Sequence, residues 1–393
     1  MRWFLSFLFL GFWGAVHALS LGPSLTPKLL LDFLKKEGNI LLGLSGKAAT
    51  PTAINSLLQE LEIYLPLGRS SVVVDHFNYD TLSAAEKHDV LLLPRPTSLR
   101  QGVKSFFSGD GILAIPRAVG QSLGIASPLI APILRAPETA YPSSSKDDDI
   151  FATGTQLALI SALQARNSAR FTVLGSVEAL EDKWFSAHVK GPKDQKQLPT
   201  VNREFAKQLS AWAFKETGVL RVGEIKHHLS DKDGAIVGDM NPKIYRIKND
   251  IAFHIELSEH GFDGWVPFDV PSDDALQLDF TMLSPFYRLN LTPKASTKNS
   301  TIFGTSFTLP DQHGIFSFRI NYRRPFLSNI EEKHEVTLRH FAHNEYPRSW
   351  EITGAWVWVT GLWSVIAGFL ALVIIWLYSA PSSTAGVRTK KIQ

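Results

Sequence analysis

One short polar run has the residue types and the position needed for acid–base chemistry. It extends from Asp75 to Asp80 and follows directly after an apolar segment typical of a β-strand, the end at which α/β sheets hold their functional groups. The carboxylate of Asp75 beside the imidazole of His76 forms a candidate acid–base pair. Aspartate and asparagine after a strand more often cap turns, and the sequence favours that role for Asp75, Asn78 and Asp80.

Two glycine-containing motifs resemble known sites and depart from them. Residues Gly43 to Lys47 look like a phosphate-binding loop, but the spacing is wrong and Ala48 stands where a magnesium-binding hydroxyl is needed. Gly175-Ser176 ends a strand as a nucleophile elbow does, but the glycine two residues later is missing. Neither motif predicts a site.

Three further groups have a structural interpretation that outweighs the functional one. Asp147 to Asp149 contain an Asp-x-Asp pattern but follow a polar run, which indicates a solvated loop. His227-His228 are adjacent, which suits a strand surface better than zinc binding. Asp263-Gly264-Trp265 could offer a sugar an aromatic platform, although a buried tryptophan of a β-sandwich is favoured. The sequence therefore predicts no catalytic, cofactor-binding or metal-binding residue.

Composition narrows the class of protein. The chain has 393 residues, 45% of them hydrophobic, which is enough for two or three domains with cores of their own. The net charge is only +3, so nucleic acid is not an expected partner. There is no cysteine, which excludes disulfides, thiol chemistry and cysteine-bound zinc.

The region from residue 21 to 218 alternates helix-like and strand-like patterns, which predicts an open α/β sheet. Thr26-Pro27 and Asn202 are expected to begin helices, and Gly38 and Gly218 to end them. Short solid apolar runs predict buried strands. The expected helices include Leu30–Leu34, Ile54–Leu61, Leu157–Arg166 and Phe205–Ala213, and the expected strands are Ile40–Leu44, Val72–Val74, Val90–Leu93, Ile112–Ile115 and Phe171–Leu174.

After Gly218 the apolar period changes to two. This alternation, with turn signals such as Pro310 to Gly314 between the segments, predicts an immunoglobulin-like β-sandwich over residues 219–346. The expected strands carry Ile251–Leu257, Leu276–Met282, Tyr287–Leu291, Phe316–Tyr322 and Val336–Leu338 on their inner faces.

Both ends of the chain carry targeting features. Arg2, an apolar run from Trp3 to Gly14 and the small residues near Ala18 predict a cleaved signal peptide over residues 1–20. An uncharged stretch from Trp356 to Tyr378 is long enough to cross a bilayer, so residues 355–379 are expected to form a transmembrane helix.

Residues 380–393 then form a short basic tail. Arg388, Lys390 and Lys391 place this tail in the cytosol by the positive-inside rule. Lys390 and Lys391 stand fourth and third from the C-terminus, which matches a dilysine retrieval signal, a receptor-read address. The sequence thus predicts a single-pass type I protein of the endoplasmic reticulum membrane with its N-terminus in the lumen.

Small residues recur along one stripe of the expected span. Small side chains let another membrane helix approach closely, so this stripe is expected to be a packing seam. Its members are Gly354, Gly361, Ser364, Gly368 and Ala371.

Two acceptor sequences for N-glycosylation fall within the expected sandwich. They begin at Asn290 and Asn299, and Pro293 makes the first the poorer acceptor. Glycans at these positions require the sandwich to be lumenal, which agrees with the expected topology.

Several longer motifs resemble the DDOST/WBP family, the 48 kDa (beta) subunit of the oligosaccharyltransferase complex, in a fungal form. The resemblance runs from about Gly22 through the span. The motifs are Asp75–Asp80, Asn202–Gly223, Trp265–Asp269, Ser284–Arg288, Leu309–Phe318 and Val336–Arg348. It implies that the α/β region is Rossmann-like or glutamine-amidotransferase-like.

The resemblance also implies a function. The family's complex transfers oligosaccharide from dolichyl diphosphate to asparagine in N-x-S/T sequences of nascent lumenal proteins. The subunit resembled here is an accessory, non-catalytic one that supports assembly and substrate presentation. Expected partners are the multi-spanning catalytic subunit, ribophorin-type subunits, membrane lipid and, as a candidate ligand, dolichol-linked oligosaccharide. The alternative is a stand-alone lumenal glycoprotein-binding or cargo-receptor module.

The N-terminus departs from the family pattern. Family members begin the mature chain with a strand, a helix and a strand ahead of the element that starts at Gly22, whereas here the signal peptide leads almost directly into it. We hypothesise a lost exon or a gene-model error, which would leave the α/β sheet incomplete and its edges exposed.

Overall fold

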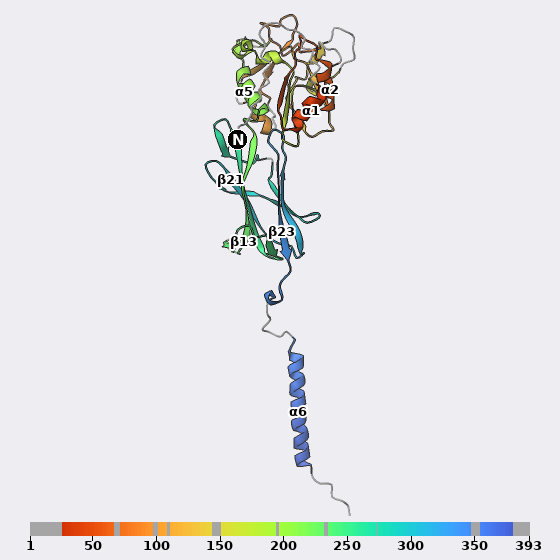
Figure 1. The fold of residues 1–393 in the computed structure, drawn as a ribbon, viewed down its shortest axis with the longest axis vertical. Helices are drawn as coiled ribbons and strands as arrows, with labels where there is room; N and C mark the ends of the chain where they lie inside the picture. Colours follow the sequence, from red (N-terminus) through yellow and green to blue (C-terminus); the bar gives the residue numbers. More distant parts are fainter. Residues whose placement is uncertain are drawn as a thin grey trace, which may run out of the picture. The chain divides into compact units, whose positions relative to one another are not determined.

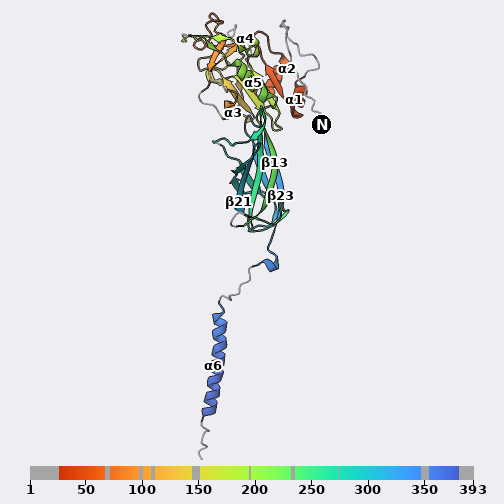
Figure 2. The same cartoon turned by 90° about the vertical axis from the view of Figure 1, so that its left-hand side faces the viewer.

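The computed structural model describes residues 26–66, 71–96, 101–107, 111–143, 151–193, 196–231, 235–272, 274–346 and 354–379. The chain divides into a compact unit that ends at Arg339 and a second unit from His340 onward. Within the first unit, α1, α2 and α5 lie among the strands of residues 26–218, and β13, β21 and β23 belong to a separate double-sheet part, residues 219–339 (Figures 1 and 2). The described residues are mostly sheet.

The main sheet of the N-terminal part has six strands in the order β1-β10-β9-β6-β2, with β7 also paired to β9. The pair β1–β10 is parallel and the other pairs are antiparallel. The bounds are β1 Ile40–Gly43, β2 Ile63–Tyr64, β6 Gln121–Leu123, β7 Ile130–Arg135, β9 Leu157–Gln164 and β10 Arg170–Leu174.

Three two-stranded sheets complete this part. They pair β3 (Val72–Val74) with β8 (Tyr141–Ser143), β4 (Val90–Pro94) with β5 (Ile112–Pro116), and β11 (His188–Val189) with β12 (Leu198–Pro199). The expected strands in this part are confirmed at β1, β3, β4, β5 and β10.

The first helix, α1 (Pro27–Lys35), begins and ends as expected. The Thr26 hydroxyl accepts the Leu29 N–H at 3.3 Å, and Pro27 occupies the first helical turn. At the other end, Glu37 turns left-handed (φ 64°), and the Gly38 N–H donates to the Phe33 carbonyl at 3.0 Å. The remaining short helices are α2 Thr52–Glu60, α3 Gln101–Lys104, α4 Asp182–Phe185, η1 Gly154–Gln156 and η2 Val177–Leu180.

The helix α5 (Asn202–Ala213) begins where expected but not for the expected reason. Val201 is its N-cap, and Asn202 lies inside the first turn. The Asn202 side chain instead bonds both backbone groups of Ala114 on β5, at 2.9 and 2.7 Å, and the carbonyl of Ala179 at 3.1 Å. It therefore ties α5 to β5 and η2.

The expected helix over Leu157–Arg166 is wrong. Residues Leu157–Gln164 form β9, a strand buried at every position and hydrogen-bonded to β6, β7 and β10. A segment buried on all sides has no polar face, so its periodicity cannot distinguish strand from helix. Hydrogen bonding to the neighbouring strands therefore makes this segment a strand rather than a helix.

The double-sheet part consists of two sheets. One has the order β14-β13-β16-β21-β20 with β17 on β16, and the other β15-β23-β22-β18-β19. The first contains β13 Val219–Ser230, β14 Ile236–Val237, β16 Asp250–Gly261, β17 Gly264–Pro267, β20 Thr292–Ser296 and β21 Thr301–Thr308. The second contains β15 Ile244–Arg246, β18 Gln277–Thr281, β19 Pro285–Asn290, β22 Gly314–Tyr322 and β23 Ile330–Arg339.

Aromatic rings fill the space between the two sheets. The ring centroid of Phe253 on β16 lies 5.1 Å from that of Phe318 on β22. The ring centroids of Phe280 on β18 and Phe307 on β21 lie 5.5 Å apart. The period-two strands expected here are confirmed, although β18 and β19 each end one residue earlier than expected.

In the second unit, α6 spans Trp356–Tyr378 and is drawn as one unbroken helix (Figure 1). It is the one helix among the described residues that is long and apolar enough to cross a membrane. A short helical turn, η3 (His343–Glu345), precedes it in the chain.

Candidate functional site

The run from Asp75 to Asp80 follows β3, and its carboxylates hold the loop in shape. Asp75 is fully buried and accepts hydrogen bonds from the Phe77 N–H (2.8 Å), the Asn78 amide (2.9 Å) and the Thr139 hydroxyl (2.8 Å). Asp80 is also buried and accepts the backbone N–H of Ser83 and of Lys190. The turn role predicted for these carboxylates is confirmed.

His76 has partners that the sequence did not suggest. Its Nδ1 lies 2.5 Å from Nδ1 of His88, and its Nε2 lies 2.8 Å from the Tyr141 hydroxyl. Tyr79 stacks on His88 with ring centroids 3.8 Å apart. These partners are 12 and 65 residues away in the chain, and no sequence signal linked them.

An ion cluster lies beyond the ends of β1 and β5. Glu178 is almost fully buried, forms an ion pair with Arg117, and lies 3.3 Å from the Lys47 ammonium. Burial raises the pKa of Glu178, but Arg117 and Lys47 outweigh this and hold it below its ordinary value. The loop that resembled a phosphate site thus contributes a lysine to an internal carboxylate. Ser176, in the suspected elbow, is buried and donates to the Pro116 carbonyl.

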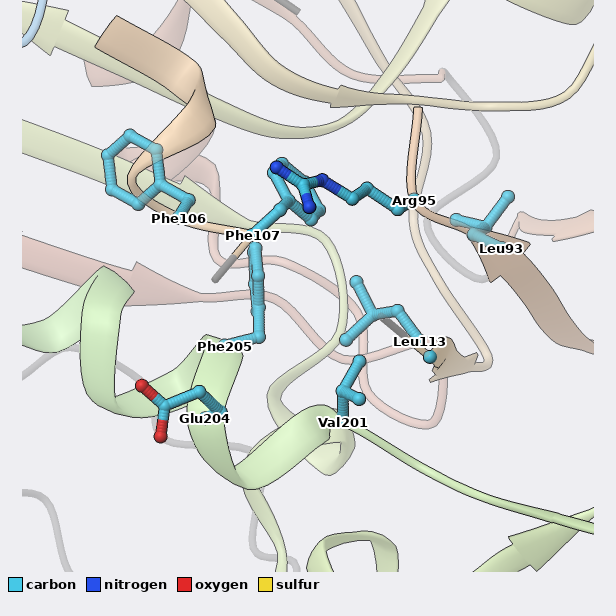
Figure 3. A pocket seen from close by; sticks show the side chains of 9 residues that line it. Leu93, Arg95, Phe106, Phe107, Leu113, Val201, Glu204 and Phe205 are labelled. Atoms are coloured by element: carbon cyan, nitrogen blue, oxygen red, sulfur yellow. The ribbon is translucent and has the colours of Figure 1, made fainter. Parts of the chain in front are cut away.

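Two cavities in the described residues of the N-terminal part differ in size and in exposure to solvent. The first, between α5 and β5, has a volume of about 10 Å³ and is lined by Phe107, Leu113 and Phe205, with Arg95 and Glu204 beside them (Figure 3). It has room for about one water molecule and none for a substrate. The second measures about 490 Å³ and is open, with leucines such as Leu31, Leu61 and Leu129 and a charged rim.

A buried arginine holds the end of α5 and the segment that leads into β13. Arg170 donates to the carbonyls of Trp212, Thr217 (2.8 Å) and Gly218 (2.7 Å), and its guanidinium lies 4.7 Å from the Trp212 ring centroid. Desolvation lowers its pKa to about 9. A charged residue ahead of a solid apolar strand was the one sequence signal for this contact.

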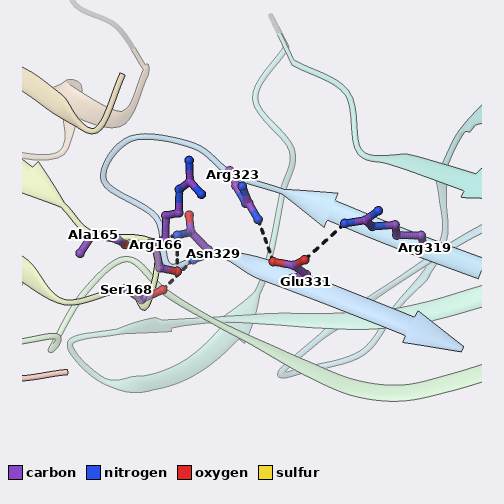
Figure 4. Close-up of polar contacts among 7 residues, drawn as sticks. All are labelled: Ala165, Arg166, Ser168, Arg319, Arg323, Asn329 and Glu331. Carbon is purple, nitrogen blue, oxygen red and sulfur yellow. Dashed lines mark hydrogen bonds and ion pairs between the residues drawn. The ribbon is translucent and has the colours of Figure 1, made fainter. Parts of the chain in front are cut away.

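The turn between β22 and β23, which we call the β22–β23 tip (residues 323–329), inserts into the same region. Phe326 is buried against Phe106 and Trp212, and its carbonyl accepts the Trp212 indole N–H at 2.8 Å. Asn329 donates to the Ser168 hydroxyl (3.0 Å) and the Arg166 carbonyl (3.1 Å) (Figure 4). The β22–β23 tip therefore completes the core of the N-terminal part with Phe326.

The adjacent histidines of β13 lie in a strand, as expected, but both are buried. His227 Nδ1 lies 2.6 Å from the Tyr245 hydroxyl, and its ring packs 5.0 Å from Phe318. Desolvation, with smaller contributions from His334 and His228, lowers the pKa of His227 to about 4. His228 stacks on His254 instead. Adjacent residues of a strand point to opposite faces, so His227 fills the space between the sheets, whereas His228 lies on the outer face of its sheet and is covered by His254.

Trp265 was expected in the sandwich core and is only half-buried. It lies on β17, which pairs with β16 alone among the strands that the structure describes. The Arg221 guanidinium covers its ring at 4.3 Å from the centroid. An edge strand exposes one side of its residues, which explains the difference.

The expected small-residue seam falls mostly on α6. Gly354 lies in a turn before the helix with φ 85°, so helical spacing does not reach it. The other four residues, Gly361, Ser364, Gly368 and Ala371, lie on the helix and fall within an arc of about 80° at 3.6 residues per turn. The hydroxyls of Thr360 and Ser364 donate to carbonyls of their own helix.

Of the other predicted sites, some lie among the described residues and some do not. Asn290 ends β19, where its Oδ1 accepts the Gln277 amide at 3.0 Å. Asn299 is exposed in the turn between β20 and β21. The signal peptide, Asp147–Asp149, Lys390 and Lys391 lie outside the described residues.

Comparison with known proteins identifies similar sequences. The family model of the OST48 N-terminal domain matches residues 15–216, and that of the OST48 middle domain matches residues 227–380. The chain is 33% identical to the dolichyl-diphosphooligosaccharide–protein glycosyltransferase subunit wbp1 of Schizosaccharomyces pombe, covering 95% of this chain and 81% of the relative.

Two further relatives agree. Subunit WBP1 of Saccharomyces cerevisiae is 31% identical over 90% of this chain and 75% of its own length. The 48 kDa subunit of Arabidopsis thaliana is 30% identical over 91% and 78%. The chain therefore belongs to the OST48 family.

Proposed function

We propose that the chain is an accessory, non-catalytic subunit of the oligosaccharyltransferase complex. The observation that carries this is the 33% identity over 95% of the chain to a relative named as a subunit of dolichyl-diphosphooligosaccharide–protein glycosyltransferase. Both family models match as well, one over residues 15–216 and the other over residues 227–380. The reaction of such a complex moves an oligosaccharide from dolichyl diphosphate to asparagine of N-x-S/T sequences.

The non-catalytic role is supported by how the N-terminal part uses its polar side chains. Asp75, Glu178 and Arg170 each have two or more partners within the chain. Side chains that are hydrogen-bonded or ion-paired within the chain hold its loops and segments in place, which is a structural role. We assign the chemistry to a multi-spanning partner subunit, and assembly and substrate presentation to this chain.

The proposed topology is single-pass and type I, in the endoplasmic reticulum membrane. It has a signal peptide over residues 1–20, a lumenal region over 21–346, a span over 355–379 and a cytosolic tail over 380–393 with Lys390 and Lys391 as retrieval signal. The apolar helix α6 supports the span. Proposed partners are the catalytic subunit, ribophorin-type subunits, membrane lipid and dolichol-linked oligosaccharide.

We assign residues 21–218 to an α/β domain of Rossmann-like or glutamine-amidotransferase-like type, and residues 219–346 to an immunoglobulin-like sandwich. The parallel pair β1–β10, with α1 and α2 nearby in sequence, supports the first assignment. The two facing antiparallel sheets with an aromatic interior support the second.

The decisive experiment is affinity purification of the full chain from mild detergent, followed by mass spectrometry. We expect the catalytic subunit and other subunits of the complex to co-purify in stable proportion. A chain that purifies as a lone monomer, or that cycles between compartments and binds free glycan without other subunits, would instead support the stand-alone cargo-receptor alternative.

A variant series tests whether α6 contributes the seam. Gly361→Leu and Gly368→Leu place large side chains on the stripe and should reduce co-purification, because a neighbouring helix loses its close approach. Val373→Leu lies on roughly the opposite side of the helix and should leave recovery unchanged. Equal losses from all three variants would argue against a seam.

For glycosylation we propose Asn299 as the modified residue. Both asparagines are exposed, but Asn299 lies in a turn, whereas Asn290 ends β19, is bonded to Gln277 and precedes the buried Leu291. Asn299→Gln should remove one endoglycosidase-sensitive mobility shift, and Asn290→Gln should not. The reverse result would refute this assignment.

A further inference from the structure

We propose that His76 and His88 bind a divalent transition-metal ion of the zinc type through their two Nδ1 atoms. These atoms lie 2.5 Å apart, so one Nδ1 donates a hydrogen bond to the other and both rings aim this nitrogen at a common point. Neutral imidazole is a preferred ligand of zinc and its neighbours in the first transition series. Nothing in the proposed subunit role uses this pair.

The other ring nitrogen of each histidine already has an oxygen partner. His88 Nε2 lies 3.1 Å from the Ala85 carbonyl, which can only accept, so His88 carries its proton on Nε2 and leaves Nδ1 free. His76 Nε2 lies 2.8 Å from the Tyr141 hydroxyl, which can donate or accept. When a metal binds both Nδ1 atoms, the proton of His76 moves from Nδ1 to Nε2. The Nε2–H then donates a hydrogen bond to the Tyr141 hydroxyl. Metal-binding histidines typically have such an oxygen on the second nitrogen.

The loop around the pair is held in place before any ion arrives. His88 has a left-handed backbone (φ 52°), its N–H donates to the Ala84 carbonyl at 3.0 Å, and Tyr79 stacks on its ring. On the other side, the buried Asp75 fixes the backbone next to His76. This rigidity lowers the entropy lost when the ion binds.

The geometry also determines how far the two rings must move and which further ligands the ion needs. Two zinc–nitrogen bonds of ~2.0–2.1 Å at a tetrahedral angle place the nitrogens about 3.3 Å apart, so the rings must separate by roughly 1 Å. His76 is exposed and has room for this movement. No group of three or more His, Asp or Glu ligands occurs among the described residues, so water fills the other positions. An open site of this kind also accepts a ligand from a partner protein.

Titration of the detergent-solubilised full chain, carrying a tag without histidine, tests the proposal. ZnCl₂ is followed by calorimetry, and Co²⁺ by its visible absorption, which reports nitrogen ligands. We expect one site per chain, with affinity at least tenfold weaker in His76→Ala and in His88→Ala. Tyr141→Phe removes only the oxygen acceptor of His76 and should weaken binding ~10-fold while keeping the cobalt spectrum.

Two controls separate this site from other histidines. His260→Ala removes an exposed histidine that bonds the Glu216 carbonyl, and His254→Ala disrupts the stacked pair with His228. Both should leave zinc affinity and circular dichroism unchanged. Unaltered binding in the His76 and His88 variants, or loss of binding in His254→Ala, would overturn the proposal.

Discussion

The N-terminal part holds charged and amide side chains in its interior, among them Asp75, Arg170 and Glu178, whereas the interior of the double-sheet part combines aliphatic side chains with a cluster of phenylalanine rings. In the first, a buried group is fixed by directed hydrogen bonds to loops and carbonyls. In the second, order comes from ring packing, which is less directional. The comparison teaches that the N-terminal part should respond most to lost hydrogen bonds, and the double-sheet part to lost volume.

The largest effect is expected from removing a core ring of the double-sheet part. Phe280 is fully buried and stacks on Phe316 with centroids 4.8 Å apart. Phe280→Ala should lower the free energy of unfolding by about 3–5 kcal/mol, because it leaves a cavity. Urea unfolding of the chain in detergent, followed by tryptophan fluorescence, measures this. Phe286→Ala, at a partly exposed ring that also touches Phe316, is the matched control and should cost about 1 kcal/mol or less.

Next in size is the loss of the buried guanidinium. Arg170→Met keeps much of the volume but removes the hydrogen bonds to Trp212, Thr217 and Gly218, so we expect a loss of about 2–3 kcal/mol. Arg203→Met, on the exposed side of α5, should change stability by less than about 0.5 kcal/mol. If the two variants behave alike, the interior polar contacts of the N-terminal part are not what orders it.

A pH titration should reveal the one strongly shifted histidine of the double-sheet part. The folded-state pKa of His227 is about 4, below its ordinary value of 6.5, so the unfolded chain binds the proton more readily. Stability is therefore complete above pH 6.5 and falls as the pH drops towards 4, by about 2 kcal/mol between pH 7.5 and pH 5. Unfolding midpoints measured across this range give the slope.

The control replaces both members of the buried polar pair. His227→Phe with Tyr245→Phe leaves no unpaired polar atom and should remove most of the slope. Burial also lowers the pKa of His254, so a smaller slope of the same sign should remain. A slope unchanged from that of the unmodified chain would place the titrating group elsewhere.

The smallest expected effects lie at the end of the β22–β23 tip and the start of β23 (Figure 4). Asn329→Ala removes side-chain bonds to the backbone of residues 165 and 166 and should cost about 1 kcal/mol. Glu331→Gln removes exposed ion pairs to Arg319 and Arg323 and should cost less than about 0.5 kcal/mol. Thermal unfolding resolves the difference, and a reversed order would show that the joint tolerates loss of its polar contacts.

Local sequence patterns predicted an element correctly where that element meets two different environments, or where its length and lack of charge are distinctive. The alternation in β16 and β22 and the uncharged length of α6 could be read directly. They were insufficient for β9, which is buried throughout, and for His227, whose neighbours give no sign of burial. The contacts of His76 with His88 and Tyr141 could not be predicted, since they depend on how two loops and the strand β8 meet.

The placement of Phe326 has a consequence for the order of events during synthesis. This ring belongs to the core of the N-terminal part, yet it is encoded roughly 100 residues after Gly218. At ~5–20 residues per second the ribosome needs about 5–20 s to reach it. Throughout that interval Phe106 and Trp212 lack their third ring. The early-made half must therefore wait for the late-made half, which gives chaperones a defined interval in which to bind it.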